Sequence, residues 1–177
     1  FRKLGAPRLY FGVNAGAMDS MVNHYTAAKR LRSDDAYTPE GKAGQRPDYA
    51  VTVYTKILKQ IYPDIPVIIG GIEASLRRVT HYDYWQDCLK PSVLVDSCAD
   101  WLCYGMGERT MIEFTKAIEA GRNVNDIRKI PQLAFYMDGK CRTKDAVILN
   151  SFERCCKDKI AFAENFHVVE TYANMLQ

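Results

Sequence analysis

Two short glycine-containing segments of this 177-residue chain have the composition of a ligand-binding turn. In the first, Gly70 and Gly71 stand between an uncharged β-branched run and a helix-favouring stretch. In the second, Gly105 and Gly107 also stand between an apolar run and a helix-favouring stretch. Glycines let a ligand approach the backbone, and the free N–H groups at a helix start favour an anion. A tight turn without any ligand is the alternative interpretation, because a glycine pair is weaker evidence than a complete phosphate-loop motif.

Polar and charged side chains beside these turns are the candidates for direct contact with a ligand. Ser75 could bind a phosphate oxygen, and Arg77 or Arg78 could neutralise its charge. Glu73 and Glu108 stand at expected helix starts, where a carboxylate can equally serve as a partner of the helix dipole. The candidate ligand-binding residues are Asn14, Gly16, Gly70, Gly71, Glu73, Ser75, Arg77, Arg78, Gly105, Gly107 and Glu108. We assign no catalytic residue.

The six cysteines have spacings that disfavour both a metal site and a disulfide framework. No CxxC or CxxxCxxC motif occurs among them. Cys98 and Cys103 are five positions apart, and Cys155 and Cys156 are adjacent, which argues against joint ligation or an easy mutual disulfide. We expect reduced thiols that serve mainly in packing, and we predict no metal site.

The elements that would position the glycine turns follow from the apolar pattern. Runs at residues 8–13, 67–69 and 101–105 predict buried strands, with small-residue turns after each of them. Apolar positions spaced on one face predict helices over residues 48–62, with Asp48 as the N-cap, and over residues 109–121. Strands joined through helices pair in parallel, so their carboxyl ends lie at one edge of the sheet. We therefore expect both glycine turns and the turn at Asn14 and Gly16 to converge on one ligand.

This alternation predicts an α/β fold with a doubly wound, mainly parallel, Rossmann-like sheet. A further strand is expected over residues 132–137, and a helix capped by Ser151 is expected to continue towards Leu176. We expect a Rossmann-like domain over residues 1–140 and a helical extension or linker over residues 141–177. Because the chain starts at Phe1 without a start signal for any element, we expect it to be a fragment of a longer protein.

Two further features leave alternatives open. Tyr82, Tyr84 and Trp85 cluster beside His81 without a clean period, which fits either a hydrophobic plug or a platform for stacking a planar ligand. Residues 28–35 place cations beside acids, which fits either a solvated, self-neutralising surface or a clamp for an anionic substrate.

The overall charge limits the classes of partner. A formal charge of +3 and a pI near 8.5 are too mild for a dedicated nucleic-acid binder, so nucleic acid is not an expected partner, although a local patch of Lys29, Arg30 and Arg32 leaves it open. No apolar run reaches membrane-spanning length and no signal peptide opens the chain. We expect a cytoplasmic protein without a membrane partner.

Four strings of the sequence resemble one known family. They are FGVNAGAMDSMVNHYT at residues 11–26, VIIGGIEASLRR at residues 67–78, HYDYW at residues 81–85 and SVLVDS at residues 92–97. These strings are similar to the N-terminal region of the YgiQ family of radical S-adenosylmethionine proteins. The two glycine turns also resemble those of the cobalamin-binding-like Rossmann domain that precedes the radical core in many related enzymes.

The resemblance implies a parent enzyme that binds a four-iron four-sulfur cluster and cleaves S-adenosylmethionine. The CxxxCxxC motif that holds such a cluster is absent here, so the radical core would lie beyond Gln177 and would be the main partner of this domain. Cobalamin is a candidate ligand, although the DxHxxG motif that supplies a histidine to cobalt is also absent. We expect an accessory domain, not catalytic alone, that positions a nucleotide-like cofactor or substrate. The alternative is an interaction or substrate-recognition module without a ligand.

Overall fold

The structure, a computed structural model, describes residues 1–139 and 145–175 of the chain. It contains two compact units. The first unit comprises Phe1–Val79 and Ser92–Tyr136, and the second comprises Thr80–Pro91 with the described part of Met137–Gln177. The predicted division into residues 1–140 and 141–177 stays a proposal.

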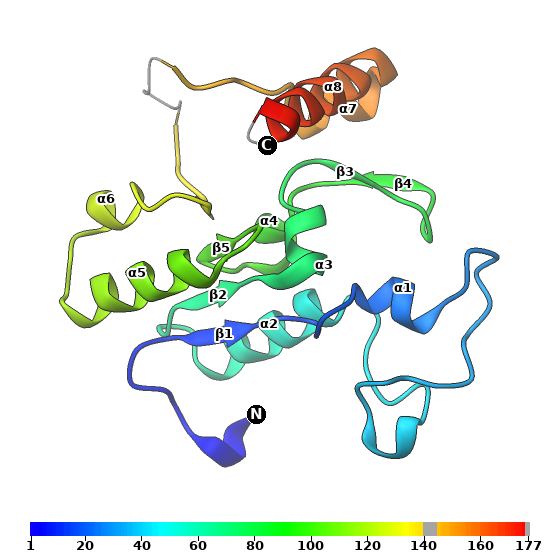
Figure 1. The fold of residues 1–177 in the computed structure, drawn as a ribbon, viewed down its shortest axis with the longest axis horizontal. Helices are drawn as coiled ribbons and strands as arrows, with labels where there is room; N and C mark the ends of the chain where they lie inside the picture. Colours follow the sequence, from blue (N-terminus) through cyan, green and yellow to red (C-terminus); the bar gives the residue numbers. More distant parts are fainter. Residues whose placement is uncertain (140–144, 176–177) are drawn as a thin grey trace. The chain divides into compact units, whose positions relative to one another are not determined.

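A four-stranded sheet forms the centre of the first unit (Figure 1). Its order is β1 (Phe11–Val13), β2 (Val67–Ile69), β5 (Trp101–Cys103) and β6 (Leu133–Phe135). The strands β1, β2 and β5 run parallel, whereas β6 pairs antiparallel with β5. The mainly parallel α/β sheet is as the sequence predicts.

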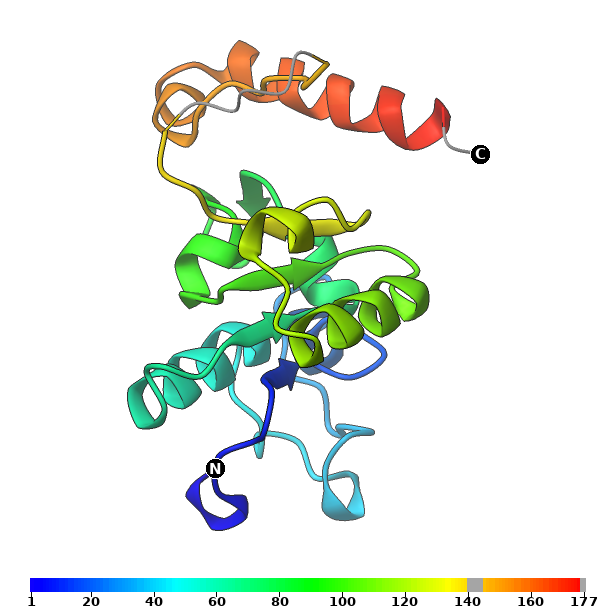
Figure 2. The same ribbon diagram turned by 90° about the vertical axis from the view of Figure 1, so that its left-hand side faces the viewer.

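Helices cover both faces of this sheet, and Figure 2 shows α2 and α5 on opposite sides of the strands. On one face, Val67 and Ile69 pack with α2 (Ala50–Ile61) and α4 (Val93–Ser97). On the other, the neighbouring Ile68 packs with α5 (Glu108–Glu119) and α6 (Val124–Ile127). Successive side chains of a strand point to opposite faces, so a strand between two helical layers must be apolar throughout. This explains the uncharged run of β2, whose three residues are all buried.

Two short helices complete the first unit, and the second unit contains a hairpin and two helices. The helices α1 (Ser20–His24) and α3 (Gly71–Leu76) follow β1 and β2, and 3-10 turns span Arg2–Leu4 and Pro39–Gly41. The second unit contains the antiparallel strands β3 (His81–Asp83) and β4 (Cys88–Lys90), and the helices α7 (Phe152–Lys157) and α8 (Lys159–Met175). The helices within residues 1–139 and 145–175 are too short or too polar to span a membrane.

Several predicted boundaries are wrong in detail. The first strand begins at Phe11 and not at residue 8. Helix α2 begins after Tyr49, which has a left-handed φ of 51°, whereas the predicted cap Asp48 accepts a hydrogen bond from the Tyr25 hydroxyl at 2.9 Å. Ser151 caps α7 as predicted, but the backbone is extended at Asp158, so the predicted single C-terminal helix is two helices.

Candidate functional site

The turns after the three parallel strands meet at one edge of the sheet and surround a pocket of about 630 Å³. The carboxyl ends of β1, β2 and β5 lie at this edge, where open α/β sheets bind ligands. The lining residues are Gly12, Val13, Asn14, Gly16, Ile68, Ile69, Gly70, Gly71, Cys103, Gly105, Gly107, Glu108 and Met111. The two glycine turns and the turn after β1 therefore come together as the sequence predicts. Whether they bind a ligand stays a prediction.

At several of the lining glycines, among them Gly71, Gly105 and Gly107, a side chain would be crowded by its neighbours or strained by a left-handed backbone. A Cβ atom at Gly107 would lie 2.5 Å from the Cys103 Sγ. Gly71 has a φ of +79°, and a Cβ there would lie 3.3 Å from the Cβ of Asn14. Glycine is favoured at such positions because other residues are strained there. Packing and backbone conformation therefore explain these glycines without a ligand, and the missing side chains also expose the backbone at the wall of the pocket.

Ser75 and Arg78 do not line the pocket but hold one of its turns in place. The Ser75 hydroxyl accepts a hydrogen bond from the Gly105 N–H at 3.2 Å. Arg78 donates to the carbonyl oxygen of Ser75 at 2.7 Å, and its guanidinium lies 5.3 Å from the centre of the Tyr104 ring. These contacts connect α3 to the turn after β5, so both side chains already have partners within the fold.

Glu73 and Arg77 also lie outside the lining, where they join helices. The buried Glu73 carboxylate accepts hydrogen bonds from the Ser20 N–H at 2.7 Å and from the Val51 N–H at 3.0 Å. These groups lie in the first turns of α1 and α2, where a carboxylate compensates the helix dipole. Arg77 forms a partly buried, two-bond ion pair with Asp19, the N-cap residue of α1. Glu73 therefore fixes two helix starts relative to α3.

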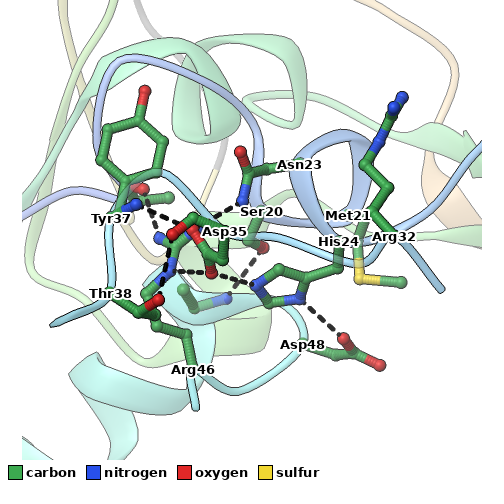
Figure 3. A network of polar contacts seen from close by, with 12 residues as sticks. Ser20, Met21, Asn23, His24, Arg32, Asp35, Tyr37, Thr38, Arg46 and Asp48 are labelled. Atoms are coloured by element: carbon green, nitrogen blue, oxygen red, sulfur yellow. Dashed lines mark hydrogen bonds and ion pairs between the residues drawn. The ribbon is translucent and has the colours of Figure 1, made fainter. Parts of the chain in front are cut away.

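A buried polar network that sequence analysis missed occupies the segment between α1 and α2 (Figure 3). Its centre is the Asp35 carboxylate, which is 1% exposed. It accepts from Arg46 at 2.7 and 3.1 Å, from the Asn23 amide at 2.8 Å and from the Tyr37 N–H at 2.9 Å. The buried His24 ring lies 3.4 Å from the same carboxylate and 3.0 Å from Asp48. Asp35 therefore does not belong to a solvated charge run, whereas the neighbouring residues 28–34 are exposed.

The network around Asp35 extends to the wall of the pocket. Arg46 donates through Nη1 to the carbonyl oxygen of Ala15 at 2.9 Å. The ring of Tyr37 lies against Gly16, where a Cβ atom would be 3.0 Å from a ring carbon. The guanidinium of Arg46 in turn lies 4.8 Å from the centre of the Tyr37 ring. Asp35 and Arg46 therefore hold the turn after β1 that lines the pocket.

The pKa of Asp35 predicts a loss of stability in acid. Burial alone would raise this pKa, but the hydrogen bonds from Arg46, Tyr37 and Asn23 outweigh it and lower the pKa from 3.8 to about 2. The pKa of Asp35 is lower in the folded than in the unfolded protein, so its ionised carboxylate stabilises the fold above about pH 4. This stabilisation is lost as the pH falls towards about 2. A shift of this size corresponds to roughly 2 kcal/mol of stability. Urea unfolding at a series of pH values measures this contribution to the free energy of unfolding. An Asp35→Asn variant whose stability falls in acid as much as that of the wild type would contradict the assignment of this contribution to Asp35.

The pocket lining is suited to binding by polar contacts and not to anion capture by side chains. Among its described residues, Glu108 supplies a carboxylate, and none is a lysine, an arginine or a histidine. Burial raises the pKa of the Cys103 thiol, so this side chain lines the pocket in its neutral form. Helix α5 begins at Glu108 without a side-chain cap, so the N–H groups of its first turn are the donors at this wall.

The predicted stacking residues belong to the second unit. Tyr82 and Tyr84 are exposed, and the rings of Tyr84 and Trp85 pack edge to face with centres 5.6 Å apart. His81, beside them, begins β3. Their role as a stacking platform stays a prediction.

The described residues do not fit an iron–sulfur cluster. Within residues 1–139 and 145–175, no three histidine, cysteine, aspartate or glutamate side chains gather closely enough to hold a metal ion. A four-iron four-sulfur cluster needs several thiolates in one place, so these residues offer no site for it.

Comparison with known proteins gives a family match over residues 1–177, to the family described as Radical SAM N-terminal. Similar proteins include a UPF0313 protein of Porphyromonas gingivalis, 54% identical over 98% of this chain and 28% of the relative. UPF0313 proteins of Bacteroides thetaiotaomicron and Geobacter sulfurreducens are 50% and 47% identical, again over 98% of this chain, and it covers 30% and 29% of their lengths. The chain thus spans less than a third of these relatives, and no solved structure matches it. Because the family match extends over residues 1–177, the chain belongs to the Radical SAM N-terminal family.

Proposed function

We propose that this chain is an accessory domain that holds a nucleotide-like cofactor or substrate for the radical core of the same protein. The observation that carries the proposal is the convergence of three small-residue turns on one pocket of about 630 Å³ at the carboxyl edge of a parallel sheet. Pockets at this place in α/β folds are the usual ligand sites. The parent enzyme, its substrate and its product are part of the proposal, since the chain covers 28% of its relative from Porphyromonas gingivalis.

In this proposal, different parts of a nucleotide contact different walls of the pocket. The Glu108 carboxylate accepts hydrogen bonds from ribose hydroxyls, as an acidic residue does in many Rossmann-like sites. The first turn of α5 donates N–H groups to a phosphate, favoured by the positive end of the helix dipole. Met111 and Cys103 give apolar contact to a base. Cobalamin, whose tail is also a nucleotide, remains a candidate ligand in this proposal.

In this proposal the reactive groups lie elsewhere in the parent protein. The four-iron four-sulfur cluster and S-adenosylmethionine would supply the radical when bound to that remaining part. The residues of this chain bind and orient the nucleotide-like ligand. Glu73, Ser75, Arg77 and Arg78 contribute by holding the turns and helix starts that shape the pocket.

A second candidate function is an interaction module that binds no ligand. It is favoured by the charge of the lining, since none of the described lining residues is a lysine or an arginine. It is also favoured by the packing reasons found for Gly71 and Gly107. In this case the exposed aromatic residues of the second unit contact the radical core or a macromolecular substrate.

Filling the pocket from α5 distinguishes the two functions. Met111 lines the pocket, whereas the neighbouring Ile112 is 56% exposed on the same helix and provides a matched control. In the full-length protein, Met111→Trp is expected to weaken binding of adenosine 5′-monophosphate or hydroxocobalamin by at least about tenfold, roughly 1.4 kcal/mol, and Ile112→Trp to leave it unchanged. Isothermal titration calorimetry gives the affinities. Equal binding by both variants would place the ligand elsewhere, and no binding by the wild type would favour the interaction module.

A further inference from the structure

The second unit contains a pocket of about 620 Å³ whose lining includes three cysteines. Cys88 comes from β4, and Cys155 and Cys156 come from α7, which packs against β4. Segments far apart in the sequence therefore bring these thiols to one cavity, beside the side chain of Lys159. Three thiols around one cavity need an explanation beyond the packing role expected from the sequence.

The three thiols differ in exposure and in bonding. Cys155 is 2% exposed, and its sulfur lies 3.3 Å from the Asn165 amide and 3.8 Å from the carbonyl oxygen of Asn150. Burial raises the pKa of Cys155, so its thiol stays protonated and enclosed. Cys88 and Cys156 are both exposed. The accessible thiols of this pocket are therefore Cys88 on the β3–β4 hairpin and Cys156 on helix α7.

The alternative pairing within α7 is disfavoured by helix geometry. Consecutive residues of a helix project about 100° apart, so the side chains of Cys155 and Cys156 point in different directions. A disulfide requires the two Cβ atoms to approach to about 4 Å. The strands β3 and β4 pair only with each other among the described residues, and β4 packs against α7, so the hairpin and this helix already lie side by side.

We propose that Cys88 and Cys156 form a reversible disulfide that links the β3–β4 hairpin to helix α7. The oxidant is a small disulfide such as oxidised glutathione. One protein thiolate attacks it, forms a mixed disulfide and releases one glutathione; the second thiolate then attacks the protein sulfur and releases the other. The two electrons reduce the glutathione disulfide, and the two thiol protons end on the two glutathione molecules. The bond fixes the hairpin that carries Tyr82 and Tyr84, so the oxidation state controls the mobility of this exposed aromatic surface.

Peptide mapping of the full-length protein tests this disulfide. After incubation with oxidised glutathione and blocking of the remaining thiols, a non-reducing digest is expected to contain a peptide pair linked through Cys88 and Cys156. Its mass is lower by two hydrogen atoms than that of the separate peptides, and a reductant separates them. The link is expected to be lost in Cys156→Ser and Cys88→Ser. It is expected to persist in Cys155→Ser and in Cys98→Ser, which removes an exposed thiol of the first unit.

Two results would overturn the proposal. One is a wild-type digest in which Cys88 and Cys156 carry separate glutathione adducts and no link. The other is a link from Cys88 to any other cysteine that forms at the same yield in Cys156→Ser. Circular dichroism of each variant identifies any that fails to fold. Since Cys88 and Cys156 are exposed, at least one of their serine variants is expected to remain folded and to decide the result.

Discussion

Replacing Arg46 with methionine is expected to destabilise the protein by about 3–5 kcal/mol, because it leaves the buried Asp35 carboxylate without its charged partner. Arg46 donates two hydrogen bonds to this carboxylate and a third to the carbonyl oxygen of Ala15. Its own side chain is 11% exposed and that of Asp35 is 1% exposed, so water does not replace the lost contacts. Urea unfolding of the purified full-length protein, followed by a probe of this region such as hydrogen exchange, measures the change.

Arg8→Ala provides the control for this prediction. Arg8 forms an ion pair with Glu119 in which both side chains are largely exposed, 81% and 59%. An exposed pair of this kind contributes less than about 1 kcal/mol. Adding Asp35→Asn to Arg46→Met removes the buried charge, so the double variant is expected to be more stable than Arg46→Met alone. If Arg46→Met costs no more than Arg8→Ala, the network is not the structural centre of this segment.

Glu73→Ala is expected to cost about 3 kcal/mol or more, since it removes two charge-assisted hydrogen bonds and leaves two buried N–H groups without an acceptor. These N–H groups belong to Ser20 in α1 and Val51 in α2, at 2.7 and 3.0 Å from the carboxylate. Glu73→Gln is expected to lose a comparable amount, because its NH₂ group would face a backbone donor. Thermal unfolding followed by circular dichroism measures both changes.

Glu113→Ala is the matched control on another helix. Its carboxylate is 39% exposed and pairs with Arg109 one turn away, an arrangement that contributes a few tenths of a kcal/mol. A Glu73→Ala variant as stable as Glu113→Ala would contradict the role of Glu73 as the acceptor for two helix starts. Retention of stability with loss of ligand binding would instead favour the role first predicted for Glu73, direct contact with a ligand.

The sheet and the convergence of its turns could be predicted because short-range patterns determine them. The β-branched run of β2 and the glycines after it occupy consecutive positions, and the parallel pairing rule then brings the turns to one edge. The uncharged run also indicates burial on both faces, as observed for Val67 and Ile68. For these strands and turns, local composition and the rule of parallel pairing are sufficient to predict the arrangement.

The polar network could not be predicted because its partners are distant in sequence and follow no period. Asp35 and Arg46 lie in a segment between α1 and α2 that contains only a 3-10 turn and reads as an exposed loop, and their pairing depends on how this segment packs. The positions of Ser75 and Arg77 illustrate the same limit. Both have residue types that bind phosphate, but the structure gives each a partner inside the fold, Gly105 and Asp19. Residue type indicates what a side chain can bind, whereas packing decides what it does bind.

The proposal that the carboxyl-edge pocket holds a nucleotide-like ligand is tested most directly by hydrogen exchange of the full-length protein with and without ligand. The probes are adenosine 5′-monophosphate, S-adenosylmethionine and hydroxocobalamin, each added separately. At least one of them is expected to slow exchange at all three turns together, at residues 14–16, 70–71 and 105–108, because one ligand would contact all three walls of the pocket. Unchanged exchange at these turns with every probe, while the protein remains folded, would contradict the proposal and favour an interaction module.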